Sequence, residues 1–316
     1  SNGWESDVYA FVLQHGIENR WQREELVLRV YPGNLAYYKS AHEFQAMERL
    51  YQAGYPVPRV LLLERDRSPF GKPFVIMEKV AGQLMWPLLF RSSGEQQSQF
   101  LTQFCDLFVR LHALDWRPFA PDMSNGRAQG EHLIARELAR GRDFVLRFTK
   151  TNFLPALAWL EKRREAVPCV RPSVVHWDFH PNNILVREDG SAVVIDWTQV
   201  DVSDARFDLA WTLTLISSYE GEAWRKRILA EYERLSGAVM PELEFFEVYA
   251  CLKRLLSVAI SLSEGAEKLG MRAEAARTMQ NPRQIKALRQ VYDQLLRLTG
   301  IGIAEIENLL AREVIS

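Results

Sequence analysis

The sequence has few cysteines, no long apolar run and no surplus of charge of either sign. Its three cysteines, Cys105, Cys169 and Cys251, lie far apart and form no C-x-x-C pair. This spacing excludes both a disulfide framework and a zinc site built from cysteine alone. A reducing cytoplasm is therefore the expected location.

The absence of a long apolar run and of a basic surplus excludes membranes and nucleic acids as partners. The longest apolar candidate, residues 248–262, is interrupted by Lys253 and Arg254, and a membrane-spanning helix needs about 20 apolar residues. No signal peptide is expected either. The formal net charge is -1, whereas nucleic acids and anionic membranes usually require a basic surplus. A small molecule is the expected partner, and the oligomeric state stays open.

What is present is the composition of a globular protein, with 47% apolar and 25% charged residues in a chain of 316. Apolar runs at residues 8–13, 26–31 and 74–77 predict strands. A helical pattern over 41–53 interrupts them, and Gly54 stands where a helix stop belongs. The first part of the chain is therefore predicted to be a small, mainly antiparallel β lobe with one helix.

After Gly82 the pattern becomes that of long amphipathic helices. These are predicted over residues 96–114, 131–148, 154–167 and 241–264. The change predicts an α+β protein of two lobes, residues 1–80 and 81–316. The chain opens with Ser1-Asn2-Gly3, and we expect the natural small lobe to have a further strand or helix before this point.

One stretch of the second lobe, residues 174–197, departs from the helical pattern. Short apolar runs at 174–175, 184–186 and 192–195 surround a turn at residues 188–191. Polar side chains are concentrated here. This predicted hairpin holds the highest density of residue types that carry out chemistry.

The polar cluster begins at His176 and is followed by Asp196 at the end of an apolar strand. If a strand ends before His176, the next loop can present Asp178 to a hydroxyl nucleophile. Asn183 and Asp196 can then converge as oxygen ligands, and Mg²⁺ favours such ligands together with phosphate oxygens. A positioned base and a metal on the phosphates are what phosphoryl transfer needs.

The motif His176-x-Asp178-x-x-x-x-Asn183, followed by Ile195-Asp196-Trp197, resembles the aminoglycoside phosphotransferase-like family of the protein-kinase-like superfamily, which is related to choline and homoserine kinases. The resemblance implies a two-lobed kinase-like fold. It also implies that Asp178 is the catalytic base and that Asn183 and Asp196 are the Mg²⁺ ligands. His176 would hold the catalytic loop in place.

The resemblance extends over most of the chain and implies further roles. Asp208, in Asp208-Leu209-Ala210, would brace the catalytic loop. Arg29 would be the phosphate-binding cation of the small lobe, with Glu43 as its ion-pair partner. The other implied nucleotide contacts are Ser6 on the phosphates, the hinge residues Met77, Glu78 and Val80, and Leu185 and Ile195 on the two sides of the base.

The implied function is a Mg²⁺-dependent transfer of the γ-phosphate of ATP or GTP to a hydroxyl of a small molecule. Three positions depart from the family pattern: Arg29 replaces the more common Lys, Trp177 replaces a small Gly, and Gly3 is the only glycine of the expected nucleotide loop. These departures motivate an alternative, a nucleotide-binding module without turnover. Intact Asp178 and Asn183 favour the enzyme.

A second alternative is a metal site of a different kind. His176, Asp178 and His180 alternate along the chain, as residues on one face of a strand do. Two histidines and one carboxylate can bind a transition metal. This interpretation leaves Asn183, Asp196 and Asp208 without a role.

Other conspicuous side chains are predicted to be structural. Trp159, Trp197, Trp211 and Trp224 lie on helical or apolar stretches, where core packing is the expected role. His112 ends an amphipathic helix and is expected to pack or to cap it.

The sequence does not choose the acceptor. A polycationic aminoglycoside would require an acidic pocket in the large lobe. Residues 201–250 contain ten acidic and five basic side chains, whereas residues 251–300 contain four acidic and nine basic ones. The region as a whole therefore has no net acidic bias.

Overall fold

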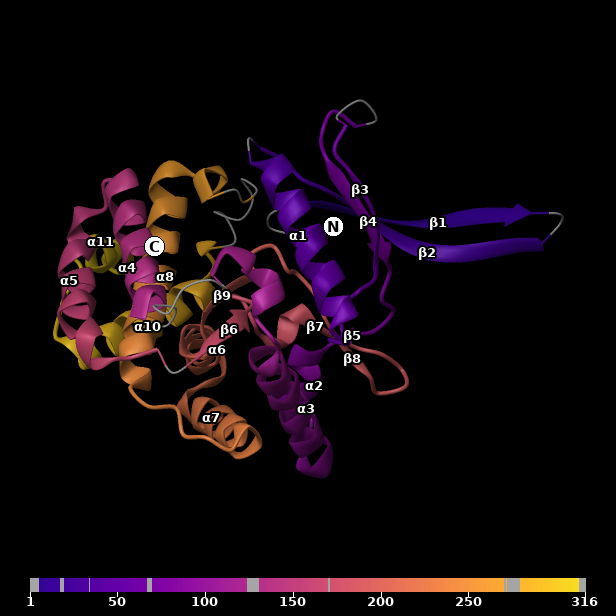
Figure 1. Ribbon diagram of the computed structural model, residues 1–316. Helices are drawn as coiled ribbons and strands as arrows, with labels where there is room; N and C mark the ends of the chain where they lie inside the picture. Colours follow the sequence, from indigo (N-terminus) through magenta and orange to yellow (C-terminus); the bar gives the residue numbers. More distant parts are fainter. Residues whose placement is uncertain are drawn as a thin grey trace.

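The computed structural model describes residues 6–17, 20–33, 35–66, 70–123, 131–169, 171–269, 271 and 279–312. The chain forms a small lobe built on an antiparallel sheet and a larger lobe that is mostly helical (Figure 1). The predicted α+β, two-lobed fold is confirmed. A boundary between the lobes after residue 80 stays our proposal.

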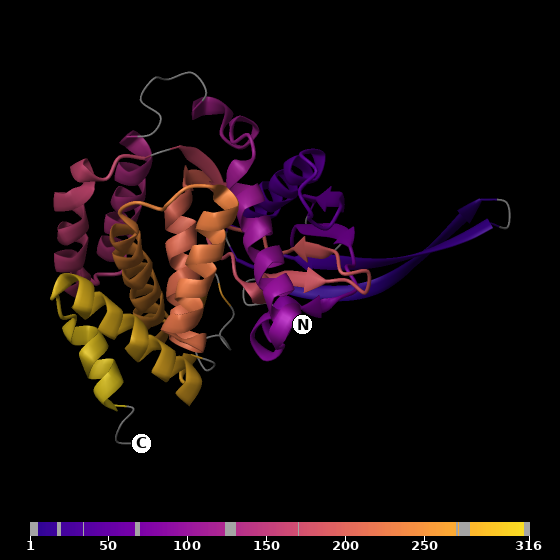
Figure 2. The ribbon, with the colours of Figure 1, turned by 90° about the horizontal axis from the view of Figure 1, so that it is seen from below.

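The small lobe contains four strands in the order β1-β2-β4-β3. Their bounds are β1 (Asp7–Ile17), β2 (Arg20–Val30), β3 (Val60–Glu64) and β4 (Phe74–Glu78). Strand β2 pairs with β4 only over Leu26–Val30. The far half of the β1–β2 hairpin therefore has no third strand beside it, and it projects from the body of the protein (Figure 2).

Helix α1 (Ala36–Gln52) is the single helix among the described residues of the small lobe, and it begins five residues before the predicted start at residue 41. Its first turn carries exposed Tyr37 and Tyr38, so no apolar periodicity marks this turn in the sequence. Farther along, the helix buries Met47 and Leu50. Its end is as predicted, because Gly54 follows with a left-handed φ of 72°.

Two small sheets belong to the central part of the chain. Strand β5 (Gln83–Leu84) pairs with β7 (Ile184–Val186), which pairs with β8 (Ala192–Val194). Strand β6 (Pro172–Val175) pairs with β9 (Asp201–Asp204). The segment before β5 passes so close to β7 that a Cβ on Gly82 would lie 2.7 Å from the carbonyl oxygen of Val186. Glycine is thus required where the connection between the lobes meets the hairpin.

The remaining elements are helices. They are α2 (Met85–Arg91), α3 (Gly94–Ala113), α4 (Glu131–Arg147), α5 (Leu154–Arg163), α6 (Ala205–Glu220), α7 (Glu222–Ser236), α8 (Leu243–Glu264), α10 (Pro282–Thr299) and α11 (Ala304–Arg312). The predicted helices agree with these bounds to within a few residues.

Helix α6 lies at the centre of the large lobe, packed between α7, α8 and α10 (Figure 2). It begins at Asp204, whose side chain accepts a hydrogen bond from the backbone N–H of Arg206, as an N-cap does. Most of its side chains are buried. Among the residues that the structure describes, no helix is long and apolar enough to cross a membrane.

Candidate active site

A cleft of about 1860 Å³ lies between the two lobes. The sheet of the small lobe and the hinge after β4 line one part of it, and the loop after β6 with helices α4, α6 and α8 line the other. Most of the predicted site residues line this cleft: Ser6, Arg29, Glu43, Met77, Glu78, Val80, Asp178, Asn183, Leu185, Ile195 and Asp196. His176 and Asp208 lie behind it, and both are fully buried.

Arg29 on β2 is bonded to three separate parts of the chain. Its Nε donates to Ser6 Oγ at 2.7 Å, its Nη1 to Glu43 Oε1 at 2.7 Å and its Nη2 to Asp196 Oδ1 at 2.8 Å. Tyr31 donates its hydroxyl to the other oxygen of Glu43. Burial opposes the charge, but Glu43 and Asp196 raise the pKa of the Arg29 guanidinium above its ordinary value.

The contacts of Arg29 include the predicted partner, Glu43, and a second partner, Ser6, that the sequence did not indicate. The predicted ion pair between Arg29 and Glu43 forms, and Glu43 is fully buried. Ser6 was predicted to donate to the phosphates, yet it is 1% exposed and accepts from Arg29. In this arrangement Ser6 helps to hold the guanidinium of Arg29 in place. The predicted loop glycine, Gly3, lies outside the described residues.

The loop between β6 and β7 is held from behind by Asp208 in the first turn of α6. The backbone N–H groups of His176 and Trp177 donate to Asp208 at 2.6 and 2.9 Å. On the other side, the His176 ring donates from Nε2 to the carbonyl oxygen of Ile195 at 3.0 Å. A buried carboxylate that accepts two backbone N–H groups fixes the loop, which is the geometry expected of a bracing residue.

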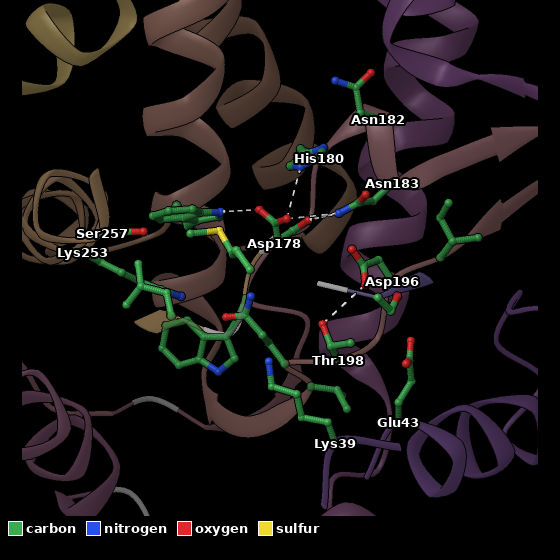
Figure 3. A pocket seen from close by; sticks show the side chains of 18 of the residues that line it. Lys39, Glu43, Asp178, His180, Asn182, Asn183, Asp196, Thr198, Lys253 and Ser257 are labelled. Carbon is green, nitrogen blue, oxygen red and sulfur yellow. Dashed lines mark hydrogen bonds and ion pairs between the residues drawn. The ribbon is translucent and has the colours of Figure 1, made fainter. Parts of the chain in front are cut away.

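Asp178 projects from this loop into the cleft (Figure 3). Oδ1 accepts from Trp211 Nε1 at 2.9 Å, and Oδ2 lies 3.3 Å from both His180 Nε2 and Asn183 Nδ2. Burial alone would raise the pKa of this carboxyl group, but the charge of His180 and the hydrogen bonds hold it well below its usual range. Asp178 is therefore an ionised hydrogen-bond acceptor.

The pKa of His180 is shifted in the opposite direction from that of Asp178. Burial favours the neutral ring, but the carboxylate of Asp178 outweighs this effect and raises the pKa of His180 above its ordinary value. Its edge faces Trp86 of α2, with ring centroids 6.4 Å apart.

Asn183 and Asp196 offer the oxygens that a magnesium ion prefers. Asn183 donates from Nδ2 to the carbonyl oxygen of Asp178 at 2.9 Å, so its Oδ1 remains for another ligand. The backbone N–H of Ile195 donates to the carbonyl oxygen of Asn183 at 2.9 Å, which keeps Asp196 near the loop. Oδ2 of Asp196 accepts no hydrogen bond from the described residues. One amide oxygen and one carboxylate fit Mg²⁺ bound together with phosphates.

The alternative with two histidines and one carboxylate does not form. Within the described ranges, no three His, Cys, Asp or Glu side chains group as metal ligands. Both ring nitrogens of His176 are already used, Nε2 by Ile195 and Nδ1 by the backbone N–H of Asp178. This prediction is wrong, because residues that alternate in sequence do not share one face of a strand after the chain turns.

Trp177 shows why a glycine suits its position. Its φ is 65°, in the left-handed region, where an L-residue costs about 1–2 kcal/mol. The ring is nonetheless 7% exposed and lies 5.7 Å from the ring of Phe207 and 6.5 Å from that of Tyr249. The loop therefore packs against neighbouring aromatic side chains of the large lobe.

The predicted hinge runs along one edge of the cleft. Glu78 ends β4 opposite Leu26 of β2, and its carboxylate accepts from Arg187 at 2.7 Å. Neither the N–H nor the C=O of Val80 is bonded to a described residue. The backbone N–H and C=O of Val80 are therefore suited to hydrogen bonds with the edge of a purine base. Leu185 of β7 lies on the facing wall.

Two cleft residues were missed by the sequence interpretation. Trp211 was assigned to the core, yet it bonds to Asp178. Its position three residues after Asp208 places both on one face of α6, which is a signal that could have identified it. Lys253 of α8 lies 4.6 Å from the centre of the Trp177 ring and 4.8 Å from that of Trp211. No sequence motif indicates this contact.

A model of the phosphotransferase enzyme family matches residues 1–246. The mouse protein named acyl-CoA dehydrogenase family member 10 is 28% identical over 217 residues, which are 63% of this chain and 20% of that protein. The chain thus spans about a fifth of that relative's length.

Solved structures are similar as well. A thermostable mutant of an aminoglycoside phosphotransferase, in a ternary complex with ADP and hygromycin B, is 18% identical, with a TM-score of 0.57 over 93% of this chain and 95% of that one. The ethanolamine kinase of Plasmodium vivax is 10% identical, with a TM-score of 0.56 over 92% and 83% of the two chains. At these identities the likeness shows the fold.

Proposed function

The chain belongs to the phosphotransferase enzyme family, and from this premise we propose that it transfers the γ-phosphoryl group of ATP or GTP to a hydroxyl group of a small molecule. The family assignment confirms the predicted resemblance and the prediction of a kinase. One observation carries the finer proposal. The ionised Asp178 faces the same cleft as Arg29 and Asp196, which are joined across the two lobes.

In the proposed reaction, the acceptor oxygen forms a bond to the γ-phosphorus while the bond from that phosphorus to the bridging oxygen breaks. The hydroxyl proton passes to Asp178 and the nucleoside diphosphate leaves. Because the pKa of Asp178 is held below its usual range, the carboxylate is a weak base. It acts mainly by orienting the hydroxyl and takes up the proton late, which suits the loose transition state of phosphoryl transfer.

Arg29 and the residues around it supply the positive charge. Glu43 and Ser6 hold the guanidinium in place before any ligand binds, so little reorganisation is needed at the phosphates. Asn183 and Asp196 would hold Mg²⁺, which supplies neutralisation of the charge on the phosphate oxygens when bound. Val80 would receive the edge of the base.

The comparisons support a nucleotide and a small acceptor without choosing either. The similar phosphotransferase is described with ADP and hygromycin B, which supports a nucleotide site in this cleft. The name of the mouse relative describes a protein five times longer than the match. A cytoplasmic location stays a prediction, as does the choice between ATP and GTP.

The test is release of nucleoside diphosphate from Mg-ATP and Mg-GTP in the presence of a panel of hydroxyl compounds. Asp178→Asn keeps the shape of the side chain and its bond from Trp211, but removes the charge. Because a positioned acid or base contributes about 10²–10⁴-fold to rate, we expect kcat to fall by about that factor. Asp106→Asn, on an exposed carboxylate of α3 that is 50% accessible, is the matched control.

Substrate-dependent release that Asp178→Asn leaves intact would contradict the proposed mechanism. Stabilisation by nucleotide in a thermal melt, with no release for any acceptor, would instead identify a nucleotide-binding module without turnover. This second outcome separates binding from catalysis, because Arg29 and the hinge do not depend on Asp178.

A further inference from the structure

The part of the cleft beyond Asp178 is basic rather than acidic. Among the described residues of the large lobe, six basic side chains line it: Arg140, Arg147, Lys253, Arg254, Lys268 and Arg283. Three acidic side chains accompany them outside the catalytic loop: Glu137, Asp201 and Glu267. The sequence left open whether the large-lobe pocket is acidic or basic. This balance of charge depends on which residues face the cleft.

Two of these acidic side chains are already neutralised. Glu137 lies 2.7 Å from Arg136 Nη2 and 3.1 Å from Arg140 Nη1. Asp201 lies 2.7 Å from Arg140 Nη1. Neither carboxylate is left to attract a polycation, because each is paired within the wall of the cleft.

Lys253 lies against an aromatic residue of the catalytic loop. Its ammonium lies over the rings of both Trp177 and Trp211, at 4.6 and 4.8 Å from the ring centres. Trp211 is the residue whose indole N–H bonds to Asp178. In Figure 3, Lys253 and Ser257 lie on the opposite side of Asp178 from Asn183 and Asp196. The positive charge thus lies where the acceptor must approach, away from the metal ligands.

Arg254, the next residue of α8, lines the same wall and is held by neutral groups. Its Nη2 donates to Gln284 Oε1 at 3.0 Å and to the Tyr219 hydroxyl oxygen at 3.3 Å. Tyr219 in turn donates to Gln284. Arg254 forms no ion pair with any carboxylate in the described ranges. A guanidinium has five N–H donors, so this one keeps both charge and donors for a ligand.

Apolar side chains complete the surface around these two cations. Phe144 of α4, Leu215 of α6, and Tyr249 and Leu256 of α8 also line the large-lobe part of the cleft. Low polarity around a cation strengthens its attraction for an anion, because less water screens the pair. It also increases the repulsion of a second cation.

We propose that the acceptor is an anionic hydroxyl compound, whose carboxylate or phosphate group is bound by Lys253 and Arg254 while its hydroxyl reaches Asp178. The proposal rests on the function proposed above and narrows its substrate class. An apolar chain between the two polar ends of the acceptor fits against the aromatic and aliphatic lining. A polycationic aminoglycoside is disfavoured at this wall.

The test compares acceptors that differ only in charge. Straight-chain hydroxy acids of increasing length are each matched with the corresponding amide, amine and phosphate monoester, and diphosphate release is measured with Mg-ATP. A charge-assisted hydrogen bond is worth about 10–100-fold in affinity. We therefore expect the anion to exceed the amide by about that factor in kcat/KM, with the amine weakest. The carboxylate and phosphate arms identify which anion is preferred.

Variants then assign the preference to these residues. Lys253→Met retains most of the stem against the two tryptophans, and Arg254→Gln retains a donor. Each is expected to raise KM for the anionic acceptor about 10–100-fold and to weaken use of the amide by a much smaller factor. Lys226→Met, at an exposed position on α7 that does not line the cleft, is the control.

The outcomes separate this inference from the function on which it rests. Equal or better use of the amine or the amide would overturn the anionic acceptor and leave the kinase intact. Equal loss for anion and amide in the variants would overturn the assigned binding residues. Absence of turnover for the whole set, with release for another hydroxyl compound of the broader panel, would overturn the anionic acceptor and leave the kinase intact.

Discussion

On the side of the cleft that we assign to the nucleotide, Arg29 is paired with Glu43 and Asp196. On the acceptor side, Lys253 lies over two indole rings and Arg254 is bonded to neutral groups. The first arrangement balances charge inside the protein and holds a cation in one place. In the second, the described contacts of the two cations are aromatic rings and neutral groups. The two halves of one cleft thus differ in the kind of group that surrounds their cations.

The largest expected effect comes from removing Arg29. Arg29→Met removes the cation from the ion pair with the buried Glu43, and breaking a buried pair in this way costs about 3–5 kcal/mol. We expect the free energy of unfolding in urea to fall by that amount, and KM for the nucleotide to rise.

Two companion variants sharpen this prediction. Arg29→Lys keeps the charge but not the fork that reaches three partners, so we expect an intermediate loss. Arg23→Met changes the same residue type on the exposed, projecting part of β2 and is expected to be neutral. If Arg23→Met and Arg29→Met unfolded at the same urea concentration, internal charge balance would not distinguish the nucleotide side.

A smaller effect is expected at Trp177, which connects the catalytic loop to the acceptor side. Truncating a buried aromatic side chain costs about 3–5 kcal/mol, whereas glycine relieves about 1–2 kcal/mol of left-handed strain. We therefore expect Trp177→Gly to lower the free energy of unfolding by about 2 kcal/mol. Turnover of the acceptor should weaken more than binding of the nucleotide, because Lys253 loses one of its rings.

Trp177→Ala is the matched comparison, since it removes the same ring but does not relieve the strain of the left-handed backbone at this position. At a position with an ordinary φ, glycine is the less stable of the two by about 0.5–1 kcal/mol. At residue 177 we expect the reverse order in urea unfolding, with Ala the less stable. The ordinary order would show that the loop does not retain a φ of 65° in solution.

The smallest effect is expected where a cation on the nucleotide side is not buried. Arg187 pairs with Glu78 at 2.7 Å, but the two side chains are 35% and 39% exposed. Exposed pairs contribute about 0–1 kcal/mol. Arg187→Gln should therefore change stability by less than about 1 kcal/mol and KM for the nucleotide only slightly. A loss as large as that of Arg29→Met would show that location in the cleft, and not burial, decides the contribution.

Much of the site could be predicted from local sequence. The loop motif from His176 to Asn183 lies between two short strands, so the residues that must act together are close in the chain. Asp208 follows at the start of the next helix, where its carboxylate reaches back to the loop. Ser6 lines the cleft, as predicted. Its hydrogen bond from Arg29 was not predicted, because the two residues are far apart in the chain and meet only in the folded small lobe. The predicted contact of Ser6 with the phosphates stays a prediction.

The residues on the acceptor wall could not be predicted in this way. Lys253 and Trp177 are 76 positions apart, and Tyr219 meets Gln284 from a different helix. Their proximity depends on how α6, α8 and α10 pack, which periodicity alone does not determine. The alternative of a metal site at His176, Asp178 and His180 failed for a related cause, because the turn in the loop directs the His176 ring to Ile195 while Asp178 and His180 pair with each other.

By itself, the sequence determined the fold class, and its resemblance to a known family indicated the loop from His176 to Asn183 and the cation Arg29, because each depends on a short pattern. Only the tertiary structure decided that Arg29 and Asp196 meet across the cleft and that basic side chains line the part that we assign to the acceptor. Net charge along a segment is a sum over all faces of its helices. The chemistry of a pocket depends on the single face that packing turns inward.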